Sequence, residues 1–310
     1  MKSTRKAYGE TLVELGKEND NIIVLDADLA KATCTELFKK EFPQRHIDIG
    51  ISEQDLVGTA CGLSMAGKDV FASSFAMFLA GRAYEQIRNS VAYNKAKVKL
   101  CATHAGLTVG EDGPTHQCIE DIALMRVIPN MIVLSPSDEN QTKYIIKNSL
   151  TLDGPVYIRL GRNEVRDLYR DTDKFEIGKS KAYGKGKKAT IFATGYAVHI
   201  ALDAKEILSD ENIETRVIDM YSLKPIDEAQ IIKCAKETDI LISIEDHSVI
   251  GGLGSAVADV LCREYPKKLY KIGVNDKFGK SGKAKDVLEK YGITKEAIIK
   301  IIKDDIEQEN

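Results

Sequence analysis

Short apolar runs recur along the chain and alternate with stretches in which apolar residues return every three or four positions. Apolar runs of this kind, closed by Gly, Pro, Asp or Thr, are typical of strands buried on both faces of a sheet. The predicted strands are NIIVLDAD (21–28), HIDIG (46–50), VKLCAT (98–103), NMIVLSP (130–136), GPVYIRL (154–160), ATIFATG (189–195), TRVIDM (215–220) and DILISIE (239–245).

The stretches between these runs have helical periodicity. Residues 52–66 are predicted to form a helix, with Ser52 and Asp55 as a capping box and Gly67 as its stop. Buried strands that alternate with helices predict an α/β protein with largely parallel sheets flanked by helices. The other helices are expected at 8–15, 139–150, 198–209 and 227–237.

Chain length and a polar break predict two domains. Residues 171–188 are rich in Lys, Asp and Gly and read as a linker, although their basic cluster could also be a binding patch. The expected domains are residues 1–170 and 189–310, both of a size that suits an independent α/β unit.

Charge and composition exclude several classes of protein. The 44 basic and 47 acidic residues give a net charge of −3, unlike a nucleic-acid binder. No uncharged run is long enough for a membrane helix, and the first residues lack the apolar core of a secretory signal. The 6 cysteines are scattered and never form CxxC, so we expect free thiols in a reducing cytoplasm.

Glu53 is the first candidate for chemistry. It follows the strand HIDIG and stands in the first turn of a predicted helix. Ligands of open α/β sheets bind at the carboxyl ends of the strands, which is where Glu53 is expected. The alternative is that Glu53 only complements the helix N-terminus.

A second candidate is the loop after the strand that ends near His104. It carries Glu111, Asp112 and His116, a denser polar cluster than a structural loop requires. Each histidine taken alone could be a satisfied polar residue. The spacing lacks HExxH, so a metal site on this chain is not expected.

Three weaker signals remain open. Phe75 and Phe78 would share a helix face, as core residues or as a ring-binding wall. Arg5 and Arg162 could hold a phosphate or be solvated surface residues. The glycines of VIGGLGS (249–255) could cradle a phosphate, but a tight turn with close helix packing is the better interpretation.

Taken together, these motifs resemble the transketolase family, specifically its pyrimidine-binding and C-terminal domains. The resemblance covers nearly the whole chain. The motifs that carry it are STRKAYGE, IIVLDAD, GISEQ, SSFAMF, RAYEQIR, THAGLTVGEDGPTHQ, RLGRNEV, IDMYSLKPID and EDHSVIGGLGSAVADVL. The combination of GEDGPTHQ with an upstream EQ and phenylalanines is highly specific.

The resemblance implies roles in cofactor chemistry. Glu53 matches the glutamate that contacts N1′ of the thiamine diphosphate aminopyrimidine and takes part in general acid–base catalysis. Phe75 and Phe78 match the aromatic residues that pack on the pyrimidine. His116 falls where the family places a residue close to the thiazolium and the donor's carbonyl end.

The resemblance also implies a sugar phosphate site. Asp112 matches the aspartate that recognises a sugar hydroxyl, and Arg5, His104 and Arg162 match residues that hold the terminal phosphate. One departure is Ala32, which stands at the family's phosphate-site serine, so that neighbouring Lys31 or Thr33 would have to replace it.

No GDG motif occurs in the chain, so the family's diphosphate-binding domain is missing. The chain therefore resembles the C-terminal subunit of a split transketolase. The implied partner is an N-terminal subunit with a GDG…N motif, which would supply Mg²⁺ or Ca²⁺ binding. Two of these chains would associate through their pyrimidine-binding domains and bind two large subunits. Alternatives are the β subunit of a 2-oxo acid dehydrogenase E1, a 1-deoxyxylulose-phosphate synthase half, and an orphan binding module.

Overall fold

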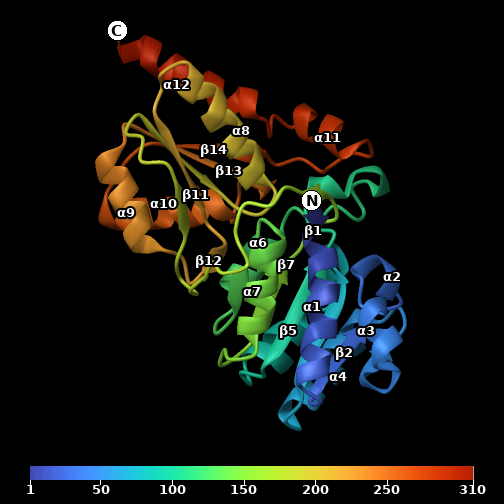
Figure 1. Ribbon diagram of the computed structural model, residues 1–310. Helices are drawn as coiled ribbons and strands as arrows, with labels where there is room; N and C mark the ends of the chain where they lie inside the picture. Colours follow the sequence, from blue (N-terminus) through green and yellow to red (C-terminus); the bar gives the residue numbers. More distant parts are fainter. Residues whose placement is uncertain (310) are drawn as a thin grey trace.

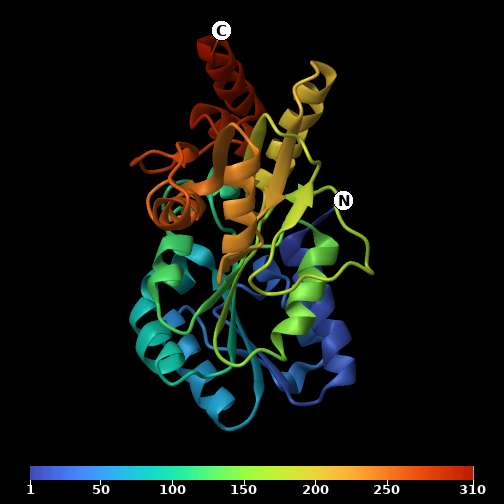
Figure 2. The same cartoon turned by 90° about the vertical axis from the view of Figure 1, so that its left-hand side faces the viewer.

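Two large sheets, each flanked by helices, make up most of the protein. The computed structural model describes residues 1–309. Figures 1 and 2 show the two sheets in separate halves of the molecule, with the C-terminus at the far end of the second half. Most neighbouring strands run parallel, so the expected α/β class with flanking helices is confirmed.

The first sheet has 7 strands, and all but β12 run parallel to their neighbours. Its strands are buried almost throughout, which explains why the sequence shows them as continuous apolar runs. In spatial order they are β12 (Ser222–Lys224), β6 (Ile132–Leu134), β7 (Val156–Arg159), β5 (Val98–Thr103), β4 (Asp69–Phe75), β2 (Ile22–Asp26) and β3 (His46–Asp48).

Helices cover both faces of the first sheet and enclose two separate apolar clusters. The helices on one face are α1 (Thr4–Glu18), α3 (Glu36–Glu41) and α7 (Glu139–Ser149). Those on the other face are α4 (Glu53–Met65), the π-helical turns η2 (Met77–Arg82) and η3 (Ile87–Ala92), α5 (Tyr84–Gln86) between them, and α6 (Asp121–Val127).

The second sheet has 5 strands, of which only β9 is antiparallel. In spatial order they are β14 (Leu269–Val274), β13 (Ile240–Ser248), β10 (Ala189–Ala193), β11 (Thr215–Asp219) and β9 (Lys181–Tyr183). Its helices are α8 (Ala197–Asp210), α9 (Glu228–Glu237), α10 (Leu253–Glu264), α11 (Ala284–Lys290) and α12 (Lys295–Glu309).

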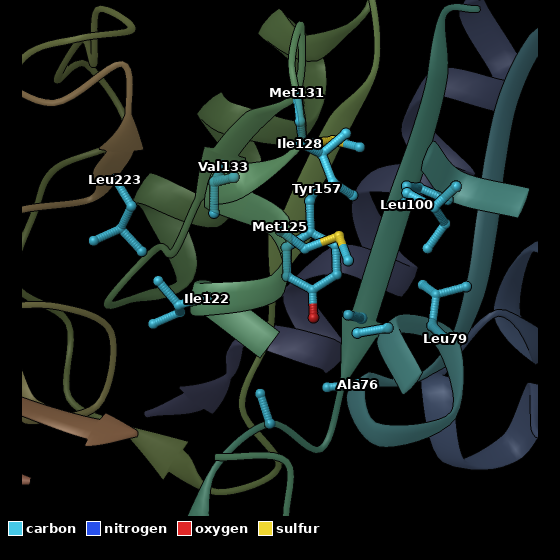
Figure 3. Packing of buried hydrophobic residues seen from close by; sticks show 14 of the residues in the cluster. Ala76, Leu79, Leu100, Ile122, Met125, Ile128, Met131, Val133, Tyr157 and Leu223 are labelled. Carbon is cyan, nitrogen blue, oxygen red and sulfur yellow. The ribbon is translucent and has the colours of Figure 1, made fainter. Parts of the chain in front are cut away.

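One strand from the C-terminal part of the chain belongs to the first sheet. Strand β12 pairs with β6, and its Leu223 is only 1% exposed. Figure 3 shows Leu223 beside Val133 and Ile122 in one apolar cluster. This cluster continues into α9 and α10, so the same core stabilises parts of both sheets.

The remaining elements are short. Strands β1 (Lys2–Ser3) and β8 (Glu164–Val165) form an antiparallel pair, and α2 (Ala30–Thr33), η1 (Pro43–Arg45) and the 3₁₀ turns η4 (Leu107–Asp112) lie in connections. Strand β9 lies within residues 171–188, the stretch predicted as a linker. Within residues 1–309, no helix is both long and apolar enough to cross a membrane.

The capping box predicted at Ser52 is wrong. Helix α4 begins at Glu53, but the Ser52 side chain makes no capping hydrogen bond. The Ser52 amide donates to the Gly50 carbonyl, and Asp55 accepts from Thr59 Oγ1 instead of reaching back. Gly67 has a φ of +88° directly after the helix, which fits its predicted role as the stop.

Candidate active site

Glu53 is a buried carboxylate at the first residue of α4. It is 2% exposed and accepts hydrogen bonds from Ser74 Oγ at 3.2 Å and from Arg82 Nη1 at 3.1 Å. An adjoining cavity of about 440 Å³ is lined by Glu53, Arg82 and residues 51, 52 and 54. A carboxyl group held in this way can share a proton with a ring nitrogen that enters the cavity.

Four aromatic side chains meet in one cluster. The Phe75 and Phe78 rings stack with centroids 5.8 Å apart, and His104 stacks on Phe75 at 3.8 Å. The His116 ring meets Phe78 edge-on at 5.1 Å. The expectation that both phenylalanines share a helix face is wrong, because Phe75 ends strand β4 and only Phe78 lies in a helical turn.

Arg82 links the carboxylate to this aromatic cluster, and the sequence reasoning did not identify it. Its guanidinium lies 4.1 Å from the Phe78 ring centroid while it pairs with Glu53. A cation over an aromatic face is stabilised by the ring quadrupole. The available signal was the spacing of four residues between Phe78 and Arg82, which places two side chains on one side of a helical turn.

His104 stands directly after β5 in the left-handed backbone region, with φ +56°. Its Nδ1 lies 2.9 Å from Thr103 Oγ1, and its Nε2 lies 3.5 Å from Arg5 Nη1. Burial, reinforced by the charges of Arg5 and Arg162, lowers the pKa of His104 to about 3. The imidazole is therefore neutral at physiological pH and offers hydrogen bonds without charge.

Two arginines flank this neutral histidine. Arg5 Nη1 donates to the Ala32 carbonyl at 2.6 Å, and Arg162 Nη1 donates to the Val109 carbonyl at 2.6 Å. The two guanidinium groups supply two positive charges, and the neutral imidazole adds no third charge. This arrangement suits binding of a doubly charged anion.

Lys31 and Thr33, the two residues that could replace the family's phosphate-site serine, differ in exposure. Thr33 is fully buried and donates to Asp26 Oδ2 at 2.6 Å, so its hydroxyl is engaged inside the protein. Lys31 is exposed on the short helix α2. Of the two replacements expected from the sequence, only Lys31 is free to reach an anion from the surface.

Asp112 and His116 lie in residues 106–117, called here the 106–117 loop. The Asp112 carboxylate is 3.8 Å from Arg162 Nη1, and His116 Nδ1 is 2.9 Å from Thr115 Oγ1. Gly110 and Gly113 take positive φ values of 80° and 76°, which favour glycine. The structure thus brings together the eight residues to which the resemblance gives a role in binding or catalysis, with Glu53 at one end and the two arginines at the other.

A larger cavity of about 830 Å³ opens beside these residues. It lies between η2, the 106–117 loop and the segment before α11, with apolar and charged side chains in its lining. Lining residues include Phe78, Arg82, Thr115, Gln117, Glu120 and Lys277. Within residues 1–309, no group of three His, Cys, Asp or Glu side chains is placed to hold a metal ion.

The glycines of residues 249–255 serve helix packing. The amides of Leu253 and Gly254, at the start of α10, donate to the buried carboxylate of Glu245 at 2.6 and 2.8 Å. A Cβ at Gly252 would lie 2.0 Å from Glu245 Oε2. A carboxylate of the protein thus occupies the N-terminus of α10. This favours the interpretation of residues 249–255 as a tight turn and not as a phosphate-binding site.

Comparison with known families matches almost the whole chain. Residues 1–167 match the model of the transketolase pyrimidine binding domain, and residues 178–298 match that of the transketolase C-terminal domain.

Named relatives are similar in length and sequence. A Methanocaldococcus jannaschii protein with the provisional name "transketolase C-terminal section" is 51% identical, over 99% of this chain and 98% of its own. A Phocaeicola vulgatus protein named as one of the subunits of an apulose-4-phosphate transketolase is 36% identical, over 97% and 96%. Against the longer transketolase of Rattus norvegicus, at 37% identity, the chain spans 48% of the relative's length.

The fold agrees with a solved relative over nearly its full length. A split-gene transketolase, described as an inactive β4 tetramer, superimposes with a TM-score of 0.91 and 50% identity, covering 98% of both chains. With both family models matched in order and relatives aligned end to end, this chain belongs to the transketolase family.

Proposed function

We propose that this chain is the C-terminal subunit of a split, thiamine-diphosphate-dependent transketolase. Together with a separate N-terminal subunit it transfers a two-carbon ketol unit from a ketose phosphate to an aldose phosphate. The observation that carries the proposal is the single row of side chains that links buried Glu53, through the aromatic cluster, to the arginines beside His104.

The residues present fit the pyrimidine end of the cofactor. Glu53 is buried beside a cavity, where its carboxyl group would hold a proton at N1′ of the aminopyrimidine. Phe75 and Phe78 would provide the apolar wall for that ring. When bound, the cofactor supplies the carbon nucleophile and electron sink that amino acids lack.

The diphosphate end belongs to the partner in this proposal. The chain contains no GDG sequence, and the partner's GDG…N motif would bind the diphosphate with Mg²⁺ or Ca²⁺. Both subunits would then be needed for activity.

The substrate phosphate is assigned to Arg5, His104 and Arg162. The guanidinium groups supply charge, and the neutral imidazole supplies a directed hydrogen bond. Asp112 would recognise a sugar hydroxyl and His116 would lie near the carbonyl end of the donor. Relatives include a Clostridium protein named 6-deoxy-6-sulfo-D-fructose transketolase subunit, 37% identical, so the terminal anion handled varies within the family.

Self-association through the pyrimidine-binding domain would use the outer face of α4. This face is exposed and carries Gln54, Gly58, Gly62 and Met65 at helical spacing. A Cβ added at Gly58 or Gly62 would meet no described atom within 4 Å, so a second helix could approach closely. We propose an assembly of two of these chains with two large subunits.

A pull-down from native cell extract tests the function. The tagged chain is captured, its partners are identified by mass spectrometry, and the eluate is assayed for cofactor-dependent ketol transfer from xylulose 5-phosphate. A stoichiometric partner with GDG…N and sugar activity supports the proposal. Oxidation of a 2-oxo acid without sugar activity would replace it by the dehydrogenase β subunit, and absence of both a partner and a cofactor response would leave the binding module.

A further inference from the structure

Strand β13 of the second sheet extends a carboxylate to the start of the 106–117 loop. Asp246 Oδ1 accepts from the Leu107 amide at 2.7 Å. Its Oδ2 accepts from the Thr108 amide at 3.3 Å and from Thr108 Oγ1 at 2.9 Å. Asp246 is 2% exposed, so these protein donors take the place of water around the carboxylate.

The contact between Asp246 and the loop has no spare room. Gly106 has a φ of +79°, and a Cβ there would lie 2.2 Å from Asp246 Oδ2. Glycine is needed at this position for its backbone conformation and also for the close approach of the carboxylate. A small shift of either partner would break the fit.

Asp246 is itself anchored in the first sheet. Its main-chain carbonyl accepts from Arg159 Nη2 at 2.7 Å, and Arg159 Nε donates to Asp121 Oδ2 at 2.9 Å. Arg159 belongs to β7 and Asp121 to α6, so the carboxylate has a fixed place relative to both sheets.

The far end of the same loop also rests on the C-terminal part of the chain. Gln117 Nε2 donates to the Gly110 carbonyl at 3.0 Å and to the Lys280 carbonyl at 2.9 Å. A Cβ at Gly113 would lie 2.2 Å from Ser281 Oγ. Between these two attachments the loop carries Asp112 and His116.

We propose that Asp246 is a positioning residue for the reaction. It fixes the Gly106–Thr108 turn, and this holds Asp112 and His116 in the positions from which they contact the substrate. Its kinetic consequence rests on the proposed function, because those two residues are assigned to the substrate there. A displacement of about 1 Å in such a group can lower the rate by about 100-fold.

The test compares Asp246 with its neighbour on the same strand. Glu245 is fully buried and also accepts two backbone amides, but those amides belong to α10. The side chain of Glu245 therefore contacts α10, whereas that of Asp246 contacts the loop. Glu245→Gln is therefore the matched control for Asp246→Asn, and Asp246→Ala removes both acceptors.

Hydrogen exchange on the full chain reads the loop directly and needs no cofactor or partner. In Asp246→Ala we expect protection of the Leu107 and Thr108 amides to fall by at least about tenfold, and in Asp246→Asn, which keeps one acceptor, we expect this fall at one of the two amides. In Glu245→Gln we expect a loss at Leu253 and Gly254, with unchanged protection at residues 107 and 108. Unchanged protection at 107 and 108 in the Asp246 variants would overturn the proposal.

Kinetics of the assembled enzyme give the second readout. We expect kcat/KM for the ketose phosphate to fall by about 10- to 100-fold in Asp246→Ala. Glu245→Gln should keep the wild-type kcat/KM even if its melting temperature falls as much as that of Asp246→Ala. If Asp246→Ala does not fold, Asp246→Asn decides the question, because it keeps one acceptor.

The two proposals fail in different ways. If the wild-type complex transfers no ketol group, the proposed function is wrong, and hydrogen exchange still decides whether Asp246 fixes the loop. If the wild-type complex is active and a folded Asp246 variant matches its kcat/KM, positioning by Asp246 is wrong.

Discussion

Glu53 and Asp55 stand two residues apart in the first turn of α4, but only Glu53 is buried. Both carboxylates complement the helix N-terminus, so this effect does not separate them. The difference lies in what surrounds them. Glu53 has Ser74 and Arg82 as donors next to a cavity, whereas the donor to Asp55 is Thr59 on its own helix.

Glu53→Gln is expected to abolish most of the turnover while assembly is retained. Glutamine can still accept from Ser74, but it cannot exchange a proton with the cofactor ring, and such catalysis contributes about 10²- to 10⁴-fold. Steady-state ketol transfer and size-exclusion chromatography measure the two effects. Asp55→Asn is the control and should remain active; wild-type turnover in Glu53→Gln would rule out the proton-holding role.

Arg162→Ala is expected to raise KM for phosphorylated sugars much more than for short unphosphorylated acceptors. Arg162 contributes charge beside neutral His104, so its loss weakens binding of the anion selectively. Initial rates with both classes of substrate check this. The exposed Arg170→Ala provides the control, and an equal rise in KM for both classes would remove Arg162 from the phosphate site.

His104 should make the protein less stable as the pH falls. Its pKa is about 3 in the folded chain and about 6.5 when unfolded, so between these values the unfolded state binds more protons. Stability contributed by the neutral ring is present above pH 6.5 and is lost as the pH is lowered towards 3.

The comparison with His104→Asn isolates this contribution, because Asn tolerates the left-handed backbone at residue 104. Between pH 6.5 and pH 5, the wild-type advantage in unfolding free energy should shrink by about 1–2 kcal/mol. Urea denaturation at the two pH values measures it. A constant difference would show that the buried ring does not resist protonation.

At the scale of elements, β12 connects the two sheets through few residues. Leu223 is the apolar residue of this three-residue strand, and it packs in the cluster shared by both sheets. Leu223→Ala is expected to cost about 2–5 kcal/mol of unfolding free energy, because a cavity remains where the side chain was. Chemical denaturation measures this cost.

Ile250→Ala is the matched control, since Ile250 is 62% exposed. Its effect should stay within about 0.5 kcal/mol. If both variants lost a similar amount of unfolding free energy, β12 would contribute little to the contact between the two sheets.

The sequence predicted the buried parallel strands well because a strand covered on both faces is apolar throughout. Each of the eight predicted strands overlaps a strand of the structure, although β13 continues to Ser248, beyond the predicted residues 239–245. Strand β4 was missed because its serines and phenylalanines were taken for part of a helix. Strands β1, β8, β9, β12 and β14 were also missed. The first four have two or three residues each and stand outside the apolar runs that indicated the other strands.

In the candidate site, too, the sequence identified residues that belong to local motifs and missed those that act through distant contacts. Residue types and their motifs identified Glu53, Asp112 and His116 from local sequence. Ser74 and Arg82 act through contacts across 21 and 29 positions, and Asp246 reaches a loop 138 residues away. No pattern in a single sequence encodes such pairings. The Glu53 contacts arise where α4 packs beside β4 and η2, and the Asp246 contact arises where the second sheet meets the 106–117 loop.

At the scale of the whole molecule, the exposed face of α4 predicts how the chain assembles. Gly58→Leu should stabilise the isolated helix by up to about 1 kcal/mol, because glycine is a poor helix former. The same substitution fills the surface that a second chain would approach, so we expect loss of the dimer with the fold retained. Light scattering after size-exclusion chromatography measures the molar mass of the assembly formed by each variant.

Glu206→Leu, on the exposed face of α8, adds a similar side chain away from this surface and should leave the mass unchanged. A Gly58→Leu protein of wild-type mass would exclude α4 from the interface.

The position of β12 limits how the chain can be divided. A fragment that stops at residue 170 keeps β6 but loses the strand that pairs with it. The amide and carbonyl groups along β6 would then be left open, and unpaired strand edges recruit other chains into aggregates. The boundary that looks natural in the sequence would therefore produce a fragment prone to aggregation, and an N-terminal unit prepared on its own would have to retain residues 222–224 or a substitute strand.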